Sequence, residues 1–334
     1  MVGIIANPAS GKDIRRLVAS ATTIDNREKV SIIQRVLAGL GVMGIDRVGI
    51  MPEAYRMGQR AVKSMPPVDH PLPQVEMLDM AVTERAEDSI DATRALVAMG
   101  AGCLIVLGGD GTTRVVSCAC GEVPLLPIST GTNNVLPTFV EGTIAGLAAG
   151  AVAQRLVEIP TVAIRHKWIQ VLVNGEPRDR ALVDVAAVRG QFVGARAIWG
   201  LENLRLIMVT RAAPTSIGIS AIAAAIARLT PSEPRGMVVN LAQPDETPWR
   251  TVRAPLGPGL VPRIGLASAE PLQVGQAHEI VVDEPWVLAL DGERETLLHP
   301  GDHLSLLLRD DGPWIVDSQR VMAQVAAQGT LSGV

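Results

Sequence analysis

The clearest chemical character in this sequence belongs to a glycine-rich segment that carries a single acid. Residues 104–113 read Leu-Ile-Val-Leu-Gly-Gly-Asp-Gly-Thr-Thr, so an apolar run ends in glycines around Asp110. Gly108, Gly109 and Gly111 let the backbone approach an anion closely, and a helix starting here offers free N–H groups to phosphate. Asp110 would then accept a proton from an attacking hydroxyl or organise Mg²⁺. The alternative is a glycine-rich turn in which Asp110 caps the helix.

Two further segments have the composition of anion-binding loops. Asn7-Pro-Ala-Ser-Gly-Lys12 follows an apolar run over residues 2–6, and Ser129-Thr-Gly-Thr-Asn-Asn134 follows another over residues 125–128. Taken alone, each also fits a turn or a capped helix start. The strands of a parallel sheet present such loops at one edge, at their carboxyl ends, where ligands bind. The sequence therefore predicts that the three loops line one phosphate site.

Neither standard nucleotide-binding motif accounts for these segments. A Walker A loop would need glycine where Ala6 stands and Ser or Thr where Asp13 stands. The dinucleotide fingerprint would need a third glycine where Arg114 stands. The segments therefore match neither motif.

Composition excludes several classes of protein. Of the 334 residues, 48% are hydrophobic and 19% charged, which provides for buried cores and excludes disorder. A net charge of −4 with only five Trp, two Phe and one Tyr argues against nucleic acid as a partner. Three cysteines cannot form a disulfide framework and fit a reducing compartment. With no signal peptide and no convincing membrane span, we expect a cytoplasmic protein without a membrane partner.

The apolar patterns predict two domains. Over residues 1–155, strands at 2–6, 48–51, 74–80, 103–107 and 124–128 alternate with helices at 27–40, 53–64, 84–99 and 143–155, which indicates an α/β domain with a parallel sheet. Residues 156–320 are β-rich, with a hairpin of strands 168–173 and 181–188 around Asn174-Gly175. An Ala-rich helix over 217–229 is expected in the core or at a subunit contact of a homo-oligomer. Residues 321–334 form a tail that is helical in part.

Taken together, the three loops resemble those of the superfamily of NAD kinases and diacylglycerol-type lipid kinases. There, Asn-Pro-x-Ser-Gly, Gly-Gly-Asp-Gly-Thr and Gly-Thr-x-Asn segments recur in this order. The full wording of Asn7–Lys12 and Thr130–Asn134 is most similar to the branch that contains acetoin-catabolism protein X. The resemblance implies a Rossmann-like α/β domain of NAD kinase type, a second, β-sandwich-like domain, and transfer of a phosphoryl group from ATP, with Mg²⁺, to a hydroxyl.

The resemblance also implies roles for individual residues. Asp110 acts at the acceptor hydroxyl as the catalytic residue, and the glycines hold the phosphates of ATP. In the reaction that we expect, Lys12 neutralises developing charge. No residue is assigned as a metal ligand, and the preferred phosphoryl donor, ATP or another, stays open. The residues expected to bind ATP are Asn7, Ser10, Gly11, Lys12, Gly108, Gly109, Gly111, Thr112, Thr130, Gly131, Thr132, Asn133 and Asn134.

The acceptor is less constrained than the donor. The segment Ala181–Gly190 is similar to one in NAD kinases whose Asn-Glu pair contacts the dinucleotide, but here Val183 replaces the amide and Asp184 shortens the acid. An unpaired group of NAD facing Val183 costs about 1–3 kcal/mol. The acceptor is therefore either NAD or a small hydroxy compound linked to acetoin breakdown, with Asp184 in its pocket. Val183→Asn with Asp184→Glu is expected to improve NAD phosphorylation in part.

Two alternatives stay open. A protein of a different class, one that senses a nucleotide without catalysis, would use the same loops. Late in the chain, Leu290–Glu295 is similar to an Asp-Gly-Glu stretch of lipid kinases, but Asp291-Gly292 is also the commonest hairpin corner, and the sequence favours that corner.

Overall fold

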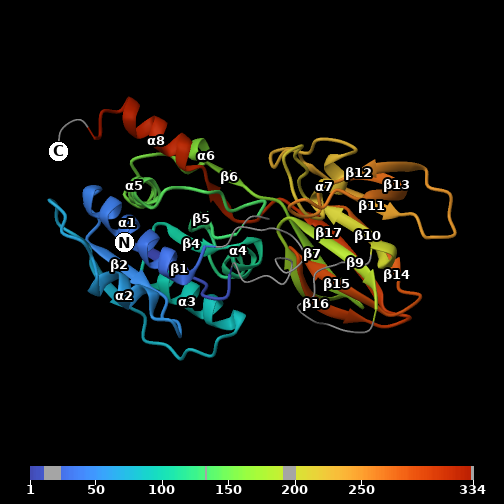
Figure 1. The fold of residues 1–334 in the computed structure, drawn as a ribbon, viewed down its shortest axis with the longest axis horizontal. Helices are drawn as coiled ribbons and strands as arrows, with labels where there is room; N and C mark the ends of the chain where they lie inside the picture. The colour runs from blue at the N-terminus through green and yellow to red at the C-terminus, as the bar shows by residue number, and fades with distance from the viewer. Residues whose placement is uncertain (11–23, 132–133, 191–200, 332–334) are drawn as a thin grey trace. The chain divides into compact units, whose positions relative to one another are not determined.

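The structure is a computed structural model that describes residues 1–10, 24–131, 134–190 and 201–331. These residues form two compact units (Figure 1), the first from residues 1–10, 24–131, 134–165 and 313–331 and the second from 166–190 and 201–312. The first is an α/β unit and the second is β-rich, as the sequence predicts. The predicted boundaries, after residues 155 and 320, differ from this division. The first sheet includes one strand that precedes the second unit in the sequence, Ala163–Arg165, and one that follows it, Trp314–Val316.

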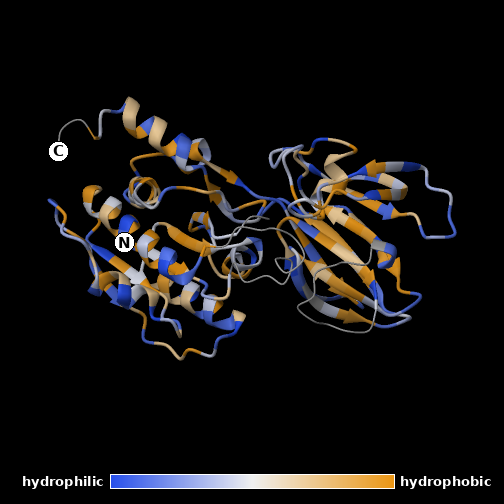
Figure 2. Ribbon diagram, viewed as in Figure 1, coloured by the Kyte–Doolittle hydropathy of each residue, from blue (hydrophilic) through white to orange (hydrophobic). Residues whose placement is uncertain are grey.

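The first unit is built on a seven-stranded sheet in the order β3-β2-β1-β4-β5-β18-β6. All neighbouring pairs are parallel except β18 with β6. The central strands β1, β4 and β5 are buried along their whole length, and Figure 2 shows hydrophobic residues running along the strands. The strands are β1 (Val2–Ala6), β2 (Arg47–Ile50), β3 (Gln74–Met77), β4 (Leu104–Gly108), β5 (Leu125–Ser129), β6 (Ala163–Arg165) and β18 (Trp314–Val316).

Helices cover both faces of this sheet. Buried residues of α1, α2, α5 and α8 form the core on one face, and those of α3 and α4 form it on the other. The two helices α1 and α5 pack so closely that a Cβ at Gly146 would collide with the carbonyl oxygen of Val36. No helix in the described part of the chain is long and apolar enough to cross a membrane. The helices are α1 (Asn26–Val42), α2 (Met57–Lys63), α3 (Ala86–Ala98), α4 (Asp110–Ser117), α5 (Gly142–Ala153), α6 (Ile159–Val162) and α8 (Ser318–Ala327).

The second unit is a sandwich of two antiparallel sheets. One has the order β12-β13-β11-β10-β9-β15-β16 and the other β14-β17-β7-β8, with a shared core between them. The short helix α7 (Ser220–Ala224) packs on the outer face of the larger sheet. The strands are β7 (Trp168–Val173), β8 (Glu176–Ala181), β9 (Asp184–Arg189), β10 (Leu204–Val209), β11 (Arg235–Leu241), β12 (Arg250–Arg253), β13 (Arg263–Gln273), β14 (Ala277–Val281), β15 (Trp286–Leu290), β16 (Glu293–Leu298) and β17 (His303–Arg309).

Two predicted elements of the second unit differ from the structure. The hairpin corner lies at Asn174-Gly175, with φ of 54° and 81°, but its second strand is β8, and the predicted strand over 181–188 is β9 of the other sheet. The apolar pattern does not indicate β8, because this edge strand consists mainly of charged residues. The predicted helix over 217–229 is wrong in length, since only α7 forms and Gly218 precedes it with a φ of 103°. Residues of α7 are buried in the core of this unit, which agrees with the first of the two locations that the sequence predicts for the Ala-rich helix.

Candidate functional site

Three loops meet at the carboxyl ends of β1, β4 and β5, because these strands are adjacent and parallel. Asn7 Nδ2 donates a hydrogen bond to Thr112 Oγ1 at 3.0 Å, which joins the loop after β1 to the start of α4. The hydroxyls of Ser10 and Thr130 lie 3.0 Å apart and join the loop after β1 to the one after β5. The Thr130 N–H also donates to the Gly108 carbonyl at 3.2 Å. The structure thus brings these five predicted residues together.

Lys29 of α1 holds the loop after β1 and was not singled out from the sequence. Its side chain is fully buried, and Nζ donates to the carbonyl oxygens of Asn7 and Ser10, each at 2.8 Å, and to Ser10 Oγ at 3.0 Å. A buried ammonium is tolerated only where it is hydrogen-bonded, and these oxygens satisfy that need. Its one sequence signal is a lysine within the apolar stripe of an amphipathic helix. Lys29 therefore places an ammonium group against the loop after β1.

Asp110 is the first residue of α4 and joins two loops. Its Oδ1 accepts the Leu136 N–H and its Oδ2 the Val135 N–H, both at 2.8 Å, and the residue is 7% exposed. The residue at the N-cap of α4 is Gly109, so Asp110 is not the cap that the alternative supposed. Both of these N–H groups belong to the segment that follows β5. Asp110 therefore fixes the segment after β5 against the start of α4.

The glycines before α4 are required by neighbouring side chains. A Cβ at Gly108 would lie 2.5 Å from Thr112 Cβ, and one at Gly109 would lie 2.8 Å from Asn134 Oδ1. Asn134 is held in place by a bond from its Nδ2 to Ser129 Oγ at 2.8 Å. The first N–H groups of any helix lack partners within that helix, and they give its N-terminus a positive dipole end. The start of α4 is therefore a close-packed cradle suited to an anion.

The remaining predicted residues fall into two groups. Gly111 is the second residue of α4 and is buried, and the Gly131 carbonyl accepts the Ser129 hydroxyl at 2.7 Å. Gly11, Lys12, Thr132 and Asn133 lie outside the described residues.

In the second unit, Asp291 organises the segment that precedes β9. Its Oδ1 accepts the N–H groups of Val183 at 2.7 Å and Asp184 at 3.1 Å, and its Oδ2 accepts that of Leu182 at 2.8 Å. Asp291 and Gly292 have φ of 50° and 86° and form the corner between β15 and β16, so the hairpin interpretation holds. Asp184 is 6% exposed, which leaves little of it open to an acceptor.

The burial of Val183 reverses the expectation for its replacement by asparagine. Val183 is 1% exposed, so Val183→Asn places an amide in the interior of the second unit. A buried polar group without partners costs about 1–3 kcal/mol, and we expect the free energy of unfolding to fall by that amount, with no gain in NAD phosphorylation. Urea denaturation measures this. Val281→Asn is the control, because Val281 is 60% exposed and the same change there should cost less than about 0.5 kcal/mol. Equal stability of Val183→Asn and the unmodified protein would contradict the burial argument.

Comparison with known proteins agrees with this architecture. Residues 2–156 match the model of the ATP-NAD kinase N-terminal domain, and residues 167–311 match that of the acetoin catabolism protein X C-terminal domain. Acetoin catabolism protein X of Cupriavidus necator is 37% identical over 318 residues, which cover 93% of this chain and 88% of that protein.

A solved structure shares the fold. The crystal structure of yeast NADH kinase complexed with NADH superposes with a TM-score of 0.56 over 100% of this chain and 88% of the kinase chain, at 12% identity. At that identity the likeness shows a common fold. The resemblance inferred from the three loops is therefore confirmed, and the chain belongs to the acetoin catabolism protein X family, with an N-terminal domain of ATP-NAD kinase type.

Proposed function

We propose that this protein is a kinase that transfers the γ-phosphoryl group of ATP to a hydroxyl of a small molecule. The observation that carries the proposal is the hydrogen-bonded meeting of three loops at the start of α4. The match of residues 2–156 to the ATP-NAD kinase domain supports it independently. Phosphoryl transfer depends mainly on positioning and charge neutralisation, and such an arrangement supplies both.

The phosphates of ATP are assigned to the first turn of α4 and the loops beside it. Unpaired N–H groups and the helix dipole favour anions there, and the Lys29 ammonium adds positive charge close by. Among the described residues, the proposed contacts are Asn7, Ser10, Gly108, Gly109, Gly111, Thr112, Thr130, Gly131 and Asn134.

The residues present fit a magnesium ion that is held mainly by phosphate. Asp110 is the only acid in the three loop segments, and its oxygens already accept two backbone N–H groups. Mg²⁺ commonly binds through one or two carboxylates together with water and substrate phosphates. Bound in this way, it would neutralise charge on the phosphate oxygens. Asp110 is the residue that would orient it.

The proposed role of Asp110 in the reaction is to accept a proton. The acceptor hydroxyl oxygen attacks the γ-phosphorus, the bond from that phosphorus to the β,γ-bridging oxygen breaks, and ADP leaves. The hydroxyl proton passes to a carboxylate oxygen of Asp110. The bonds from Val135 and Leu136 hold the carboxylate still while this happens.

Two acceptors are consistent with the relatives. The fold of yeast NADH kinase, solved with NADH, suggests NAD or NADH. The name of the relative from Cupriavidus necator suggests a small hydroxy compound in acetoin catabolism. Val183 and the buried Asp184 replace the Asn-Glu pair of NAD kinases, and on this ground we favour the small hydroxy compound.

A nucleotide sensor without catalysis is the second candidate. Both oxygens of Asp110 accept backbone N–H groups, an arrangement that a purely structural carboxylate would also have. Release of ADP from Mg·ATP separates the two functions, tested with NAD, NADH, hydroxy ketones and polyols in turn. The kinase releases ADP only with its acceptor. Tight ATP binding in calorimetry without ADP release on any acceptor supports the sensor.

A valine at Gly109 is expected to weaken ATP binding. Gly109 has a φ of −107°, which any residue adopts, so the cost comes from contact with Asn134. Overpacking of this kind costs about 1–3 kcal/mol, which corresponds to a rise of about ten- to a hundredfold in the Kd of Mg·ATP. Calorimetry measures the Kd, and Gly109→Ala, with no further methyl groups, should show a smaller rise. Unchanged affinity in a folded Gly109→Val variant would show that this loop does not hold the nucleotide.

A further inference from the structure

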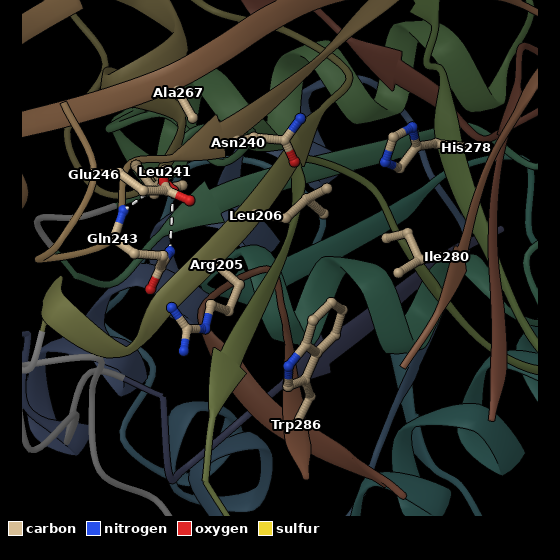
Figure 3. Close-up of a pocket in the computed structure, with 10 residues that line it drawn as sticks. All are labelled: Arg205, Leu206, Asn240, Leu241, Gln243, Glu246, Ala267, His278, Ile280 and Trp286. Carbon is tan, nitrogen blue, oxygen red and sulfur yellow. Dashed lines mark hydrogen bonds between the residues drawn. The ribbon is translucent and has the colours of Figure 1, made fainter. Parts of the chain in front are cut away.

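A cavity of about 250 Å³ that is open to solvent lies at the surface of the second unit. Its walls come from both sheets, with Leu206 on β10 and Trp286 on β15 of one, and Ile280 on β14 of the other. Figure 3 shows Gln243 and Glu246 at one side of the cavity, His278 and Ile280 at the opposite side, Leu206 between them and Trp286 at the bottom of the view. None of these residues belongs to the loops at the start of α4.

Two buried polar atoms that line this cavity have no hydrogen-bond partner among the residues that the structure describes. They are Trp286 Nε1, a donor, and Gln243 Oε1, an acceptor. Trp286 is 8% exposed, so water does not readily compensate for the missing partner. The amide of Gln243 is oriented by a bond from Nε2 to the Leu241 carbonyl at 3.0 Å, which leaves its oxygen as the unpaired atom. Buried groups of this kind are normally satisfied, and a ligand can satisfy both.

The charges around the cavity are already compensated. Arg205 Nε and Nη2 donate to Glu284 Oε1 at 3.0 and 2.7 Å, so its charge is paired. Burial lowers the pKa of His278 from its ordinary value, against the opposing effect of Glu270 and Glu279, so the imidazole is neutral at pH 7. Glu246 is exposed at the rim and would repel an anion. The cavity therefore offers neither an unpaired cation nor a buried carboxylate to a charged ligand.

We propose that this cavity is a second binding site, for a small uncharged molecule with an apolar body. The molecule accepts a hydrogen bond from Trp286 Nε1 and donates one to Gln243 Oε1. The walls of Leu206 and Ile280 contact its apolar part. An engineered cavity of about 150 Å³ holds benzene, so this one accommodates a ring with a polar substituent. The site is independent of the proposed kinase reaction.

The test uses four probes that share a benzene ring, namely benzyl alcohol, benzamide, toluene and benzoate. Their binding to the full-length protein is titrated by saturation-transfer NMR at pH 7. Benzyl alcohol and benzamide are expected to bind and to compete with each other, toluene to bind more weakly, and benzoate not to bind. Trp286→Phe keeps a ring but removes the N–H donor. It should raise the Kd of benzyl alcohol by about two- to tenfold and leave the Kd of toluene unchanged.

A second variant locates the probes. Ile280 is half-buried on the edge strand β14, and Ile280→Trp fills the cavity from that side, so it should abolish binding of all probes. It also keeps the test valid if Trp286→Phe does not fold. Three results overturn the proposal: no probe binds the unmodified protein, benzoate binds more tightly than benzyl alcohol, or benzyl alcohol binds Ile280→Trp as well as the unmodified protein.

Discussion

Replacing Asp110 by asparagine is expected to slow phosphoryl transfer by at least about a hundredfold, the usual scale for a positioned general base. The amide cannot take the hydroxyl proton, and its NH₂ group cannot accept the N–H of Val135 or Leu136. ADP release in the presence of the true acceptor measures the rate. Turnover equal to that of the unmodified protein would remove Asp110 from the chemistry.

The same variant is also expected to lose stability, so a control for that effect is needed. Loss of one buried acceptor costs about 1–3 kcal/mol of the free energy of unfolding. Asp88 in α3 is a matched site, because it is 8% exposed and accepts the N–H groups of Thr83 and Glu84 at 2.9 and 2.8 Å. Asp88→Asn should therefore lose similar stability and keep full turnover per folded molecule. If Asp88→Asn slowed turnover as much as Asp110→Asn, the loss would reflect stability and not a lost proton acceptor.

Replacing Lys29 by methionine is expected to be the most damaging change in the first unit. Methionine has similar length but no donor, so three oxygen atoms of Asn7 and Ser10 lose a charged partner. Bonds to charged groups contribute about 1.5–3 kcal/mol each, and we expect a loss of about 3 kcal/mol or more in the free energy of unfolding. Because the loop after β1 is released, the Kd of Mg·ATP should also rise by more than about tenfold.

Urea denaturation and calorimetry measure the two effects of Lys29→Met. Lys63→Met is the control, since Lys63 is exposed at the end of α2 and its loss should change stability by less than about 0.5 kcal/mol. A Lys29→Met variant that binds Mg·ATP as tightly as the unmodified protein would show that Lys29 does not support the site.

The sequence predicts the central sheet and its loops well because local signals coincide there. The strands β1, β4 and β5 are short, buried runs of mainly apolar residues, and segments rich in Gly, Ser, Thr and Asn follow them. Parallel pairing brings the carboxyl ends of such strands to one edge of the sheet. In β8, which is charged, and in β13, which is long and contains Gly265 and Pro271, these signals do not occur together. The apolar pattern therefore does not predict either strand.

The side-chain partners of the site were not predictable from local pattern. Lys29 is one of several charged residues on α1, and only its contact with the loop after β1 distinguishes it from the exposed ones. Asp291 is recognisable as a hairpin corner, but the N–H groups that it binds lie more than 100 residues earlier in the chain. Contacts between such distant segments arise from tertiary packing, which spacing and composition do not encode.

Transfer of phosphate to a hydroxyl is tested by following the phosphate itself. The protein is incubated with Mg²⁺, [γ-³²P]ATP and each acceptor of the panel, and the products are separated. We expect label to appear on one acceptor in a one-to-one ratio with ADP. Asp110→Asn should slow formation of this product by at least about a hundredfold, while Asp88→Asn should leave it unchanged per folded molecule. Label that stays in ATP with every acceptor, or that appears only as inorganic phosphate, would contradict the proposed transfer.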